Sequence, residues 1–336
     1  MSRKLLSIAF QTDKRAQEYI ALAKLVSQYP FDLVSVYCDA PFHPSFGPLM
    51  LMAPYLSNAR IGPAAVSPFR IHPIDIAAQT ALLADHASGG VYLGLSRGAW
   101  LKDHGINEPD HPIRGMREAI GIIRNLLRGE SAGLKGDIFQ VSDHVRAPYP
   151  LPEMDTPLMI GTWGKQLARL AGQLADEVKI GGSANPKMAQ YLQPFITQGE
   201  IKAGRAGGSV GIVMGAVTVV DADRKLARQL AREQVAMYLP VVAPLDPTLQ
   251  IDPELIAGIE QAVNQGKLDL AASLISDELL DLFSLSGNVS DIVTQVMALF
   301  DQGVRRVEFG TPHGLSAETG IQLLGKEVLP VIQKSL

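Results

Sequence analysis

Short apolar segments alternate with amphipathic segments along the whole chain, and this alternation constrains the fold most. Eight apolar segments have the length of a buried strand, and each is followed by a segment with apolar residues at helical spacing. The predicted strands are Lys4–Phe10, Asp32–Tyr37, Arg60–Val66, Val91–Ser96, Leu158–Gly161, Glu177–Gly181, Gly211–Val219 and Val304–Phe309. The predicted helices lie near Arg15–Gln28, Pro48–Ser57, Ile74–Ala87, Pro112–Arg128, Lys165–Ala175, Pro186–Ala203, Arg224–Tyr238 and Ala317–Gln333. Eight such units favour an α/β fold of the (β/α)8 TIM barrel type over an open doubly wound sheet.

Two segments are longer than a minimal barrel requires. Gly129–Thr156 follows the fourth unit, and its Leu134–Val141 segment, with Gly136-Asp137 at the centre, is typical of a small hairpin. Pro240–Gly303 follows the seventh unit. It predicts further helices at Pro253–Asn264, Leu270–Leu285 and Val289–Asp301. No low-complexity linker divides the chain, so we expect residues 1–336 to form one barrel domain with two insertions.

A glycine-containing turn between the fifth strand and its helix predicts an anion site. Gly161, Thr162, Trp163, Gly164 and Lys165 separate the apolar strand from a helix with one apolar stripe. A strand, glycine turn and helix direct several backbone N–H groups and the positive end of the helix dipole toward one point. This geometry favours a phosphate, although two glycines can also serve only to make a tight connection.

Composition and charge exclude several classes of protein. The net charge of −4 comes from 30 basic and 34 acidic residues without a long run of either sign, which argues against nucleic-acid binding. Cys38 is the only cysteine, so an intrachain disulfide or a cysteine-rich zinc site is excluded, and the histidines are not spaced for a metal site. No apolar run has membrane-spanning length and the N-terminus lacks a signal-peptide core, so we expect a cytoplasmic protein without membrane partners.

Motifs spread over nearly the whole chain resemble the luciferase-like superfamily of flavin- and F420-dependent barrels. They are Gly62-Pro63, the Pro68…His72-Pro73 spacing, Gly94-Leu95-Ser96-Arg97-Gly98, Lys135-Gly136-Asp137-Ile138-Phe139, Ala171-Gly172…Ala175-Asp176 and Ile275-Ser276-Asp277…Phe283…Gly287. Within the superfamily, the sequence is most similar to the F420-dependent methylenetetrahydromethanopterin reductase branch. The resemblance implies an oxidoreductase that binds F420, or alternatively FMN, across the barrel mouth, acts on a small-molecule substrate and forms a homodimer.

The resemblance also implies which residues hold the cofactor. Its phosphate is expected at the Gly161–Lys165 turn, and a non-prolyl cis peptide between Ala64 and Ala65 is expected to back the ring. The residues expected to bind the cofactor are Asp39, Ala64, Ala65, Ser96, Arg97, Gly98, Gly161, Thr162, Trp163, Gly164, Lys165, Gly181 and Gly182.

Departures from the family pattern leave the reacting group open. F420-dependent relatives commonly carry Asp-His after the second strand, where this chain has Asp39-Ala40. The carboxylates that the reductase branch places at the first strand and after the fourth correspond to Ala9 and Ala99. His43 and His313 are the candidate catalytic residues, because each follows a strand end at the expected mouth and imidazole can transfer a proton near neutral pH.

Four functions therefore remain open from the sequence. The first is an F420-dependent enzyme that transfers a hydride to or from a small organic substrate, and the second is an FMN-dependent monooxygenase. A catalytically silent cofactor-binding homologue is the third, since Ala9 and Ala99 replace expected carboxylates. The fourth, a non-redox barrel acting on a phosphorylated substrate, predicts Lys or Glu at strand ends, where few are found.

Overall fold

Eight parallel strands form a barrel in the computed structural model, which describes residues 3–335. The barrel strands are β1 (Leu5–Phe10), β2 (Leu33–Val36), β3 (Arg60–Pro63), β4 (Leu93–Ser96), β7 (Leu158–Gly161), β8 (Glu177–Gly181), β9 (Gly211–Val220) and β11 (Arg306–His313). Their order around the sheet is β3-β2-β1-β11-β9-β8-β7-β4. Parallel bridges from Ile61 to Val91 and from Val66 to Leu95 join β3 to β4 and complete the circle. The predicted TIM barrel is therefore confirmed.

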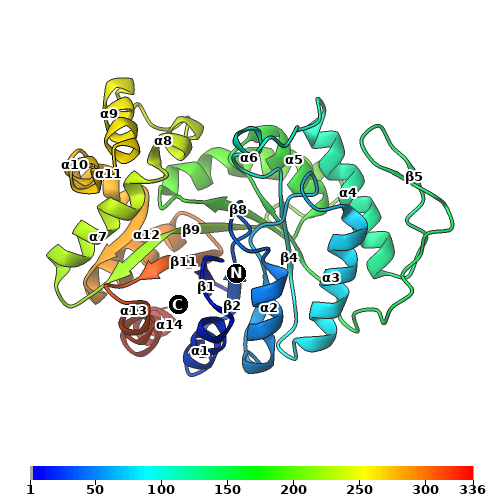
Figure 1. Cartoon of the computed structure of the whole chain (residues 1–336), viewed down its shortest axis with the longest axis horizontal. Helices are drawn as coiled ribbons and strands as arrows, with labels where there is room; N and C mark the ends of the chain where they lie inside the picture. Colours follow the sequence, from blue (N-terminus) through cyan, green and yellow to red (C-terminus); the bar gives the residue numbers. More distant parts are fainter. Residues whose placement is uncertain (1–2, 336) are drawn as a thin grey trace.

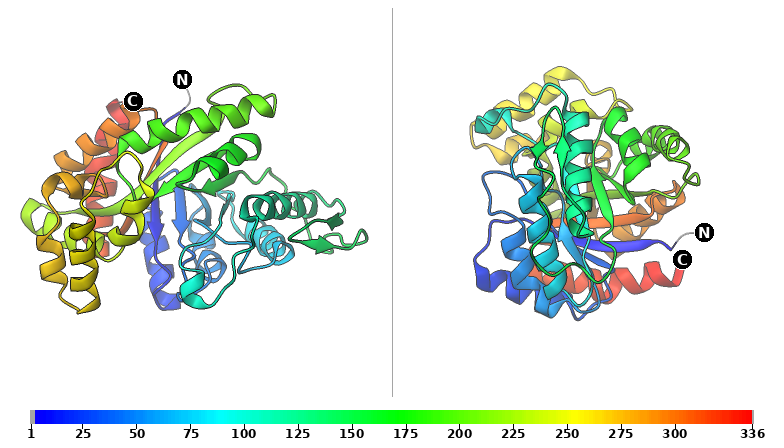
Figure 2. Two further views of the ribbon diagram at one scale, coloured as in Figure 1. Left: turned by 90° about the horizontal axis from the view of Figure 1, so that it is seen from above. Right: turned by 90° about the vertical axis from the view of Figure 1, so that its right-hand side faces the viewer.

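Helices surround the barrel, as Figures 1 and 2 show. They are α1 (Ala16–Val26), α2 (Phe46–Met52), α3 (Pro73–His86), α4 (Pro112–Leu127), α5 (Lys165–Leu174), α6 (Pro186–Lys202), α7 (Arg224–Ala236), α12 (Val289–Asp301), α13 (Ala317–Leu323) and α14 (Leu329–Ser335). Short 3₁₀ segments add η1 (Ala53–Tyr55), η2 (Lys102–His104) and η3 (Ala243–Leu245), and one π-helical turn, η4 (Leu324–Val328), joins α13 to α14. The main apolar core lies between the strands and these helices. No helix within residues 3–335 combines the length and apolar character needed to cross a bilayer.

Both predicted insertions are present, and they lie at opposite ends of the molecule (Figure 1). The first contains the antiparallel hairpin of β5 (Leu134–Lys135) and β6 (Gln140–Val141) next to α4. The second contains α8 (Leu239–Val242), α9 (Pro253–Asn264), α10 (Leu268–Ser273), α11 (Asp277–Asp281) and β10 (Ser284–Gly287). The helices of this insertion share a second apolar cluster with α7.

The helix predicted over Leu270–Leu285 is wrong. Helix α10 ends at Ser273, and Ser276 caps the separate helix α11 by accepting a hydrogen bond from Leu279 N–H at its hydroxyl. The last residues form β10, which pairs in parallel with the end of β9. Pairing with an edge that only the folded barrel provides therefore overrides the local helical pattern.

The interior of the barrel holds charged side chains beside a small apolar cluster of Leu33, Tyr92 and Met159. Residues 177, 179, 306 and 308 point inward from β8 and β11, because alternate residues of a strand face opposite sides of the sheet. Arg306 contacts Glu177 at 2.6 Å and Glu308 at 3.4 Å, and Lys179 forms an ion pair with Glu308. Burial alone would raise the pKa of Glu308, but Lys179 and Arg306 hold it below its ordinary value. This ionic network lies beneath the barrel mouth.

Candidate functional site

A cavity of about 1600 Å³ opens at the carboxyl ends of the barrel strands. Active sites of (β/α)8 barrels lie at this face. Every residue expected to bind the cofactor lines the cavity, from Asp39 and Ala64-Ala65 to Ser96–Gly98, Gly161–Lys165 and Gly181-Gly182. Their roles stay predictions, but the fold brings all of them to one place.

The Gly161–Lys165 turn has the donor groups that an anion needs. Helix α5 begins at Lys165, and its apolar residues Leu167, Leu170 and Ala171 are buried against the barrel. Thr162 accepts the N–H of Gly164 at 2.9 Å. The N–H groups of Trp163, Lys165 and Gln166 have no acceptor among residues 3–335. These N–H groups and the helix dipole can therefore hold a phosphate.

Two side chains of the turn have contacts that the sequence did not predict. The indole of Trp163 donates from Nε1 to the carbonyl oxygen of Gly181 at 3.1 Å, which ties the turn to β8. The ammonium group of Lys165 lies 5.3 Å from the ring centre of Tyr191 and 5.4 Å from that of Phe195. The Lys165 ammonium, which was expected to bind the phosphate, therefore already forms cation–π contacts with α6.

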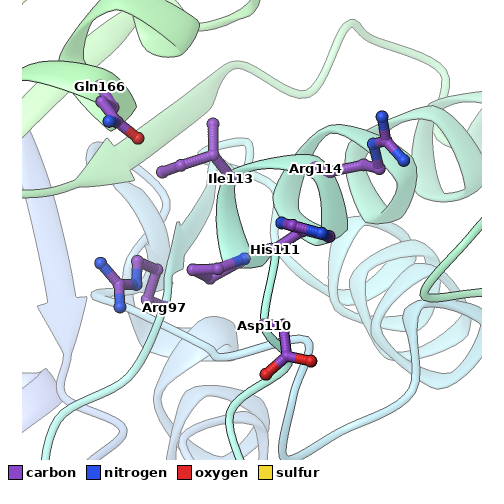
Figure 3. Close-up of a pocket in the computed structure, with 7 residues that line it drawn as sticks. Arg97, Asp110, His111, Ile113, Arg114 and Gln166 are labelled. Carbon is purple, nitrogen blue, oxygen red and sulfur yellow. The ribbon is translucent and has the colours of Figure 1, made fainter.

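Arg97, Ile113 and Gln166 line both the main cavity and a smaller one of about 300 Å³. The smaller cavity is lined from three places in the fold: the end of β4, the start of α4 and the start of α5 (Figure 3). The guanidinium of Arg97 donates from Nε and one Nη to the two carboxylate oxygens of Glu108, each at 2.6 Å. This bidentate hydrogen bond raises the pKa of Arg97 and compensates its charge locally.

Tyr37 and Asp39 bring protic groups to the cavity next to Ala64. Gln11 donates to Asp39 Oδ2 at 3.3 Å, and burial raises the pKa of the Asp39 carboxyl above its ordinary value. The ammonium group of Lys179 lies 5.1 Å from the ring centre of Tyr37. Sequence reasoning missed both Tyr37 and Lys179 as cavity residues. The sequence did contain a signal for Lys179: Glu177 and Lys179 are two charged residues at alternate positions of an apolar strand, and charged residues are rarely buried without a partner.

The two candidate catalytic histidines have different positions. His43 is exposed and is absent from the cavity lining, so its position gives no support to a catalytic role. His313 lines the cavity at the end of β11 and is buried. Its Nε2 is 3.0 Å from the carbonyl oxygen of Ala9, which makes Nε2 the protonated nitrogen of a neutral ring.

Burial lowers the pKa of His313 to about 4. Since a histidine in the unfolded chain titrates near pH 6.5, the unfolded state binds more protons between these two values. We therefore expect the stabilisation from neutral His313 to be complete above pH 6.5 and to decline as the pH falls toward 4. Urea unfolding midpoints at pH 7 and pH 4.5 measure this for the wild type and His313→Asn, since Asn tolerates the positive φ of 79° at this position. The wild type should lose more stability than the variant, and equal losses would show that His313 is not the responsible group.

The backbone next to the cavity has the feature expected from the family resemblance. The peptide bond between Ala64 and Ala65 is cis, and these residues follow β3 at the cavity wall. Residues 3–335 contain no cluster of three or more His, Cys, Asp or Glu side chains arranged to hold a metal ion.

Comparison with known proteins identifies the family. The sequence profile of the family described as luciferase-like monooxygenase matches residues 7–306. The chain belongs to this family. It is 28% identical to the 5,10-methylenetetrahydromethanopterin reductase of Archaeoglobus fulgidus, over 97% of this chain and 99% of the reductase. It is also 28% identical to the F420-dependent glucose-6-phosphate dehydrogenase of Microbacterium testaceum, over 82% of this chain and 78% of that enzyme.

A solved structure confirms the barrel fold. The coenzyme F420-dependent tetrahydromethanopterin reductase from Methanopyrus kandleri superposes with a TM-score of 0.89, covering 98% of this chain and 100% of the reductase chain. Its sequence identity of 23% makes this a comparison of folds. The family, barrel and cis peptide expected from the sequence are thus all found.

Proposed function

We propose that this luciferase-like protein is an oxidoreductase that uses coenzyme F420 to transfer a hydride to or from a small organic substrate. The observation that carries the proposal is the continuous cavity between the Ala64-Ala65 peptide and the free N–H groups of the Gly161–Lys165 turn. The similarity to the F420-dependent dehydrogenase of M. testaceum and to the A. fulgidus reductase favours F420 over FMN.

The residues present fit a planar ring joined to a phosphate-bearing arm. Gly98 and Gly182 have positive φ values of 100° and 77°, which favour glycine and leave the adjoining backbone open to the cavity. The Gly161–Lys165 turn would hold the phosphate, and Ala64-Ala65 would support the ring. F420 when bound supplies the hydride-carrying carbon of its deazaflavin ring.

The protein's own side chains would position the substrate and hold the proton that accompanies hydride transfer. Tyr37 Oη and the Asp39 carboxyl are protic groups in the cavity beside Ala64. Because neutral His313 donates its Nε2 proton to Ala9, it is less suited to donating that proton to a substrate. Ala9 and Ala99 provide no carboxylate, so we do not propose methylenetetrahydromethanopterin as the substrate.

Spectroscopic titration of the purified protein with F420 and FMN tests this proposal. We expect F420 to bind at micromolar concentration or more tightly, and FMN to bind at least about tenfold more weakly. The reverse preference would favour an FMN-dependent monooxygenase. If neither cofactor binds, the redox proposal fails.

We further propose that residues 1–336 work as one domain, in a homodimer within the cytoplasm. The single-domain proposal is supported by β10 of the second insertion, which extends the sheet directly from β9. The homodimer is an expectation from the family resemblance. Light scattering from the purified protein should give twice the mass of one chain, whereas a monomer would contradict it.

A further inference from the structure

One wall of the main cavity differs in chemistry from the phosphate end. We call it the apolar wall, and it is formed by α7, α8 and η3. The residues of the apolar wall are Leu230, Gln234, Met237, Tyr238, Val241, Val242, Pro244 and Leu245. None of these side chains carries a charge. The hydroxyl of Tyr238 donates to the carbonyl oxygen of Phe283 at 2.7 Å, which leaves the amide of Gln234 as the uncommitted polar group on this wall.

Large apolar side chains on the apolar wall are exposed at the mouth of the cavity. Met237, Val241 and Leu245 retain 49%, 41% and 48% of their surface. Phe42, Trp100 and Leu315, which follow other strands of the barrel, also line the cavity and are 42%, 38% and 44% exposed. Apolar side chains gathered around a hollow mark a binding site for an apolar ligand, unlike single exposed residues scattered over a surface.

The charged groups of the cavity lie elsewhere: Lys165 packs against Tyr191 and Phe195 of α6, and the other cations have polar partners. Arg97 is paired with Glu108, Lys179 with Glu308, and Lys14 at the rim with Asp13. Arg70 donates to the carbonyl oxygen of Cys38 at 2.9 Å. A phosphate or carboxylate of a substrate on the apolar wall would therefore lose its hydration without gaining a cation.

We propose that the apolar wall binds the hydrocarbon part of the substrate, and that the substrate is a neutral, largely apolar organic compound rather than a phosphorylated sugar or an anionic pterin. The identity of the cofactor beside the apolar wall rests on the proposed function. The binding of an apolar ligand to the apolar wall does not depend on the cofactor. The cavity volume of about 1600 Å³ exceeds that of a typical small-molecule site, which leaves room for a substrate beside a cofactor.

Calorimetric titration with 2-alkanones from acetone to 2-decanone tests the proposed substrate class. These probes are neutral, carry one hydrogen-bond acceptor and differ only in hydrocarbon length. We expect the dissociation constant for the F420-saturated protein to fall about fourfold with each added methylene until the wall is covered. A constant that does not depend on chain length, or glucose 6-phosphate binding more tightly than 2-decanone, would overturn the proposal.

A pair of variants localises the effect to the apolar wall. Val241→Asp places a charge on the wall, and Leu226→Asp places the same charge at a 51% exposed position of α7 outside the cavity lining. We expect 2-decanone to bind at least about tenfold more weakly to Val241→Asp and unchanged to Leu226→Asp. Equal binding of 2-decanone to the two variants would overturn the assignment. A Val241→Asp protein that binds 2-decanone normally but changes from dimer to monomer would also overturn it, because the apolar wall would then be a protein interface.

The same titration separates this inference from the proposed function. If F420 does not bind, the 2-alkanone series is measured on the protein alone, and a fall in dissociation constant with chain length would still support the apolar wall. If F420 binds and the series shows no such fall, the substrate class is wrong while the cofactor assignment holds.

Discussion

Gly164→Asp should weaken F420 binding at least about a hundredfold while leaving the fold intact. The added carboxylate would lie in the Gly161–Lys165 turn, where two like charges about 4 Å apart cost on the order of 4 kcal/mol at a protein surface. The turn tolerates the side chain itself, because Gly164 has φ −103° and ψ 139°, and its added Cβ would meet nothing closer than Thr162 Oγ1 at 3.7 Å. The measurement is the dissociation constant for F420 by fluorescence titration.

Gly164→Asn is the matched control for this change. Gly164 is the N-cap of α5, and both Asp and Asn are favourable N-cap residues, so either variant should match or exceed the thermal stability of the wild type. Asn has nearly the same shape as Asp but no charge, so it should weaken F420 binding much less. If Asp and Asn have equal effects, or if Asp leaves the affinity unchanged, the phosphate does not lie at this turn.

Glu308→Gln should lower the free energy of unfolding by about 3–5 kcal/mol. The wild-type carboxylate is fully buried and pairs with Lys179, whose side chain is also buried. Removing the negative charge leaves the ammonium of Lys179 in the barrel without its partner, whereas Arg306 keeps Glu177. Guanidinium unfolding followed by circular dichroism measures the loss.

An exposed ion pair provides the comparison for Glu308→Gln. Asp137→Asn makes the same chemical change at the Arg114–Asp137 pair, where both side chains are more than half exposed. We expect that change to cost less than about 1 kcal/mol, because solvent screens surface pairs. The double variant Lys179→Met, Glu308→Gln should recover part of the lost stability. Equal costs for the buried and exposed changes would show that the buried network contributes no more than a surface pair.

The sequence predicted the barrel because its strands are encoded locally. The segments Leu158–Gly161 and Glu177–Gly181 were placed without error, since apolar runs between glycines and helix starts mark buried parallel strands. The Gly161–Lys165 turn could also be placed, because its donors are backbone groups whose direction follows from a strand, turn and helix in order.

Features that depend on distant contacts could not be predicted in this way. The β10 strand exists because β9 extends beyond the barrel and offers it an edge. The partnership of Lys179 with Glu308 joins residues 129 positions apart, and the aromatic contacts of Lys165 come from α6. The sequence of the apolar wall predicts only an amphipathic helix and the loop that follows it. That Met237 and Val241 line the cavity is shown only by the folded chain.

A crystal structure of the protein grown with equal concentrations of F420 and FMN would show which cofactor the cavity selects and where its phosphate lies. We predict F420 in the main cavity, its phosphate within hydrogen-bonding distance of the free N–H groups of Trp163, Lys165 and Gln166, and its ring against the Ala64-Ala65 peptide. FMN in the cavity would show that the cofactor assignment is wrong, and F420 bound with its phosphate away from the Gly161–Lys165 turn would show that the phosphate site is wrong.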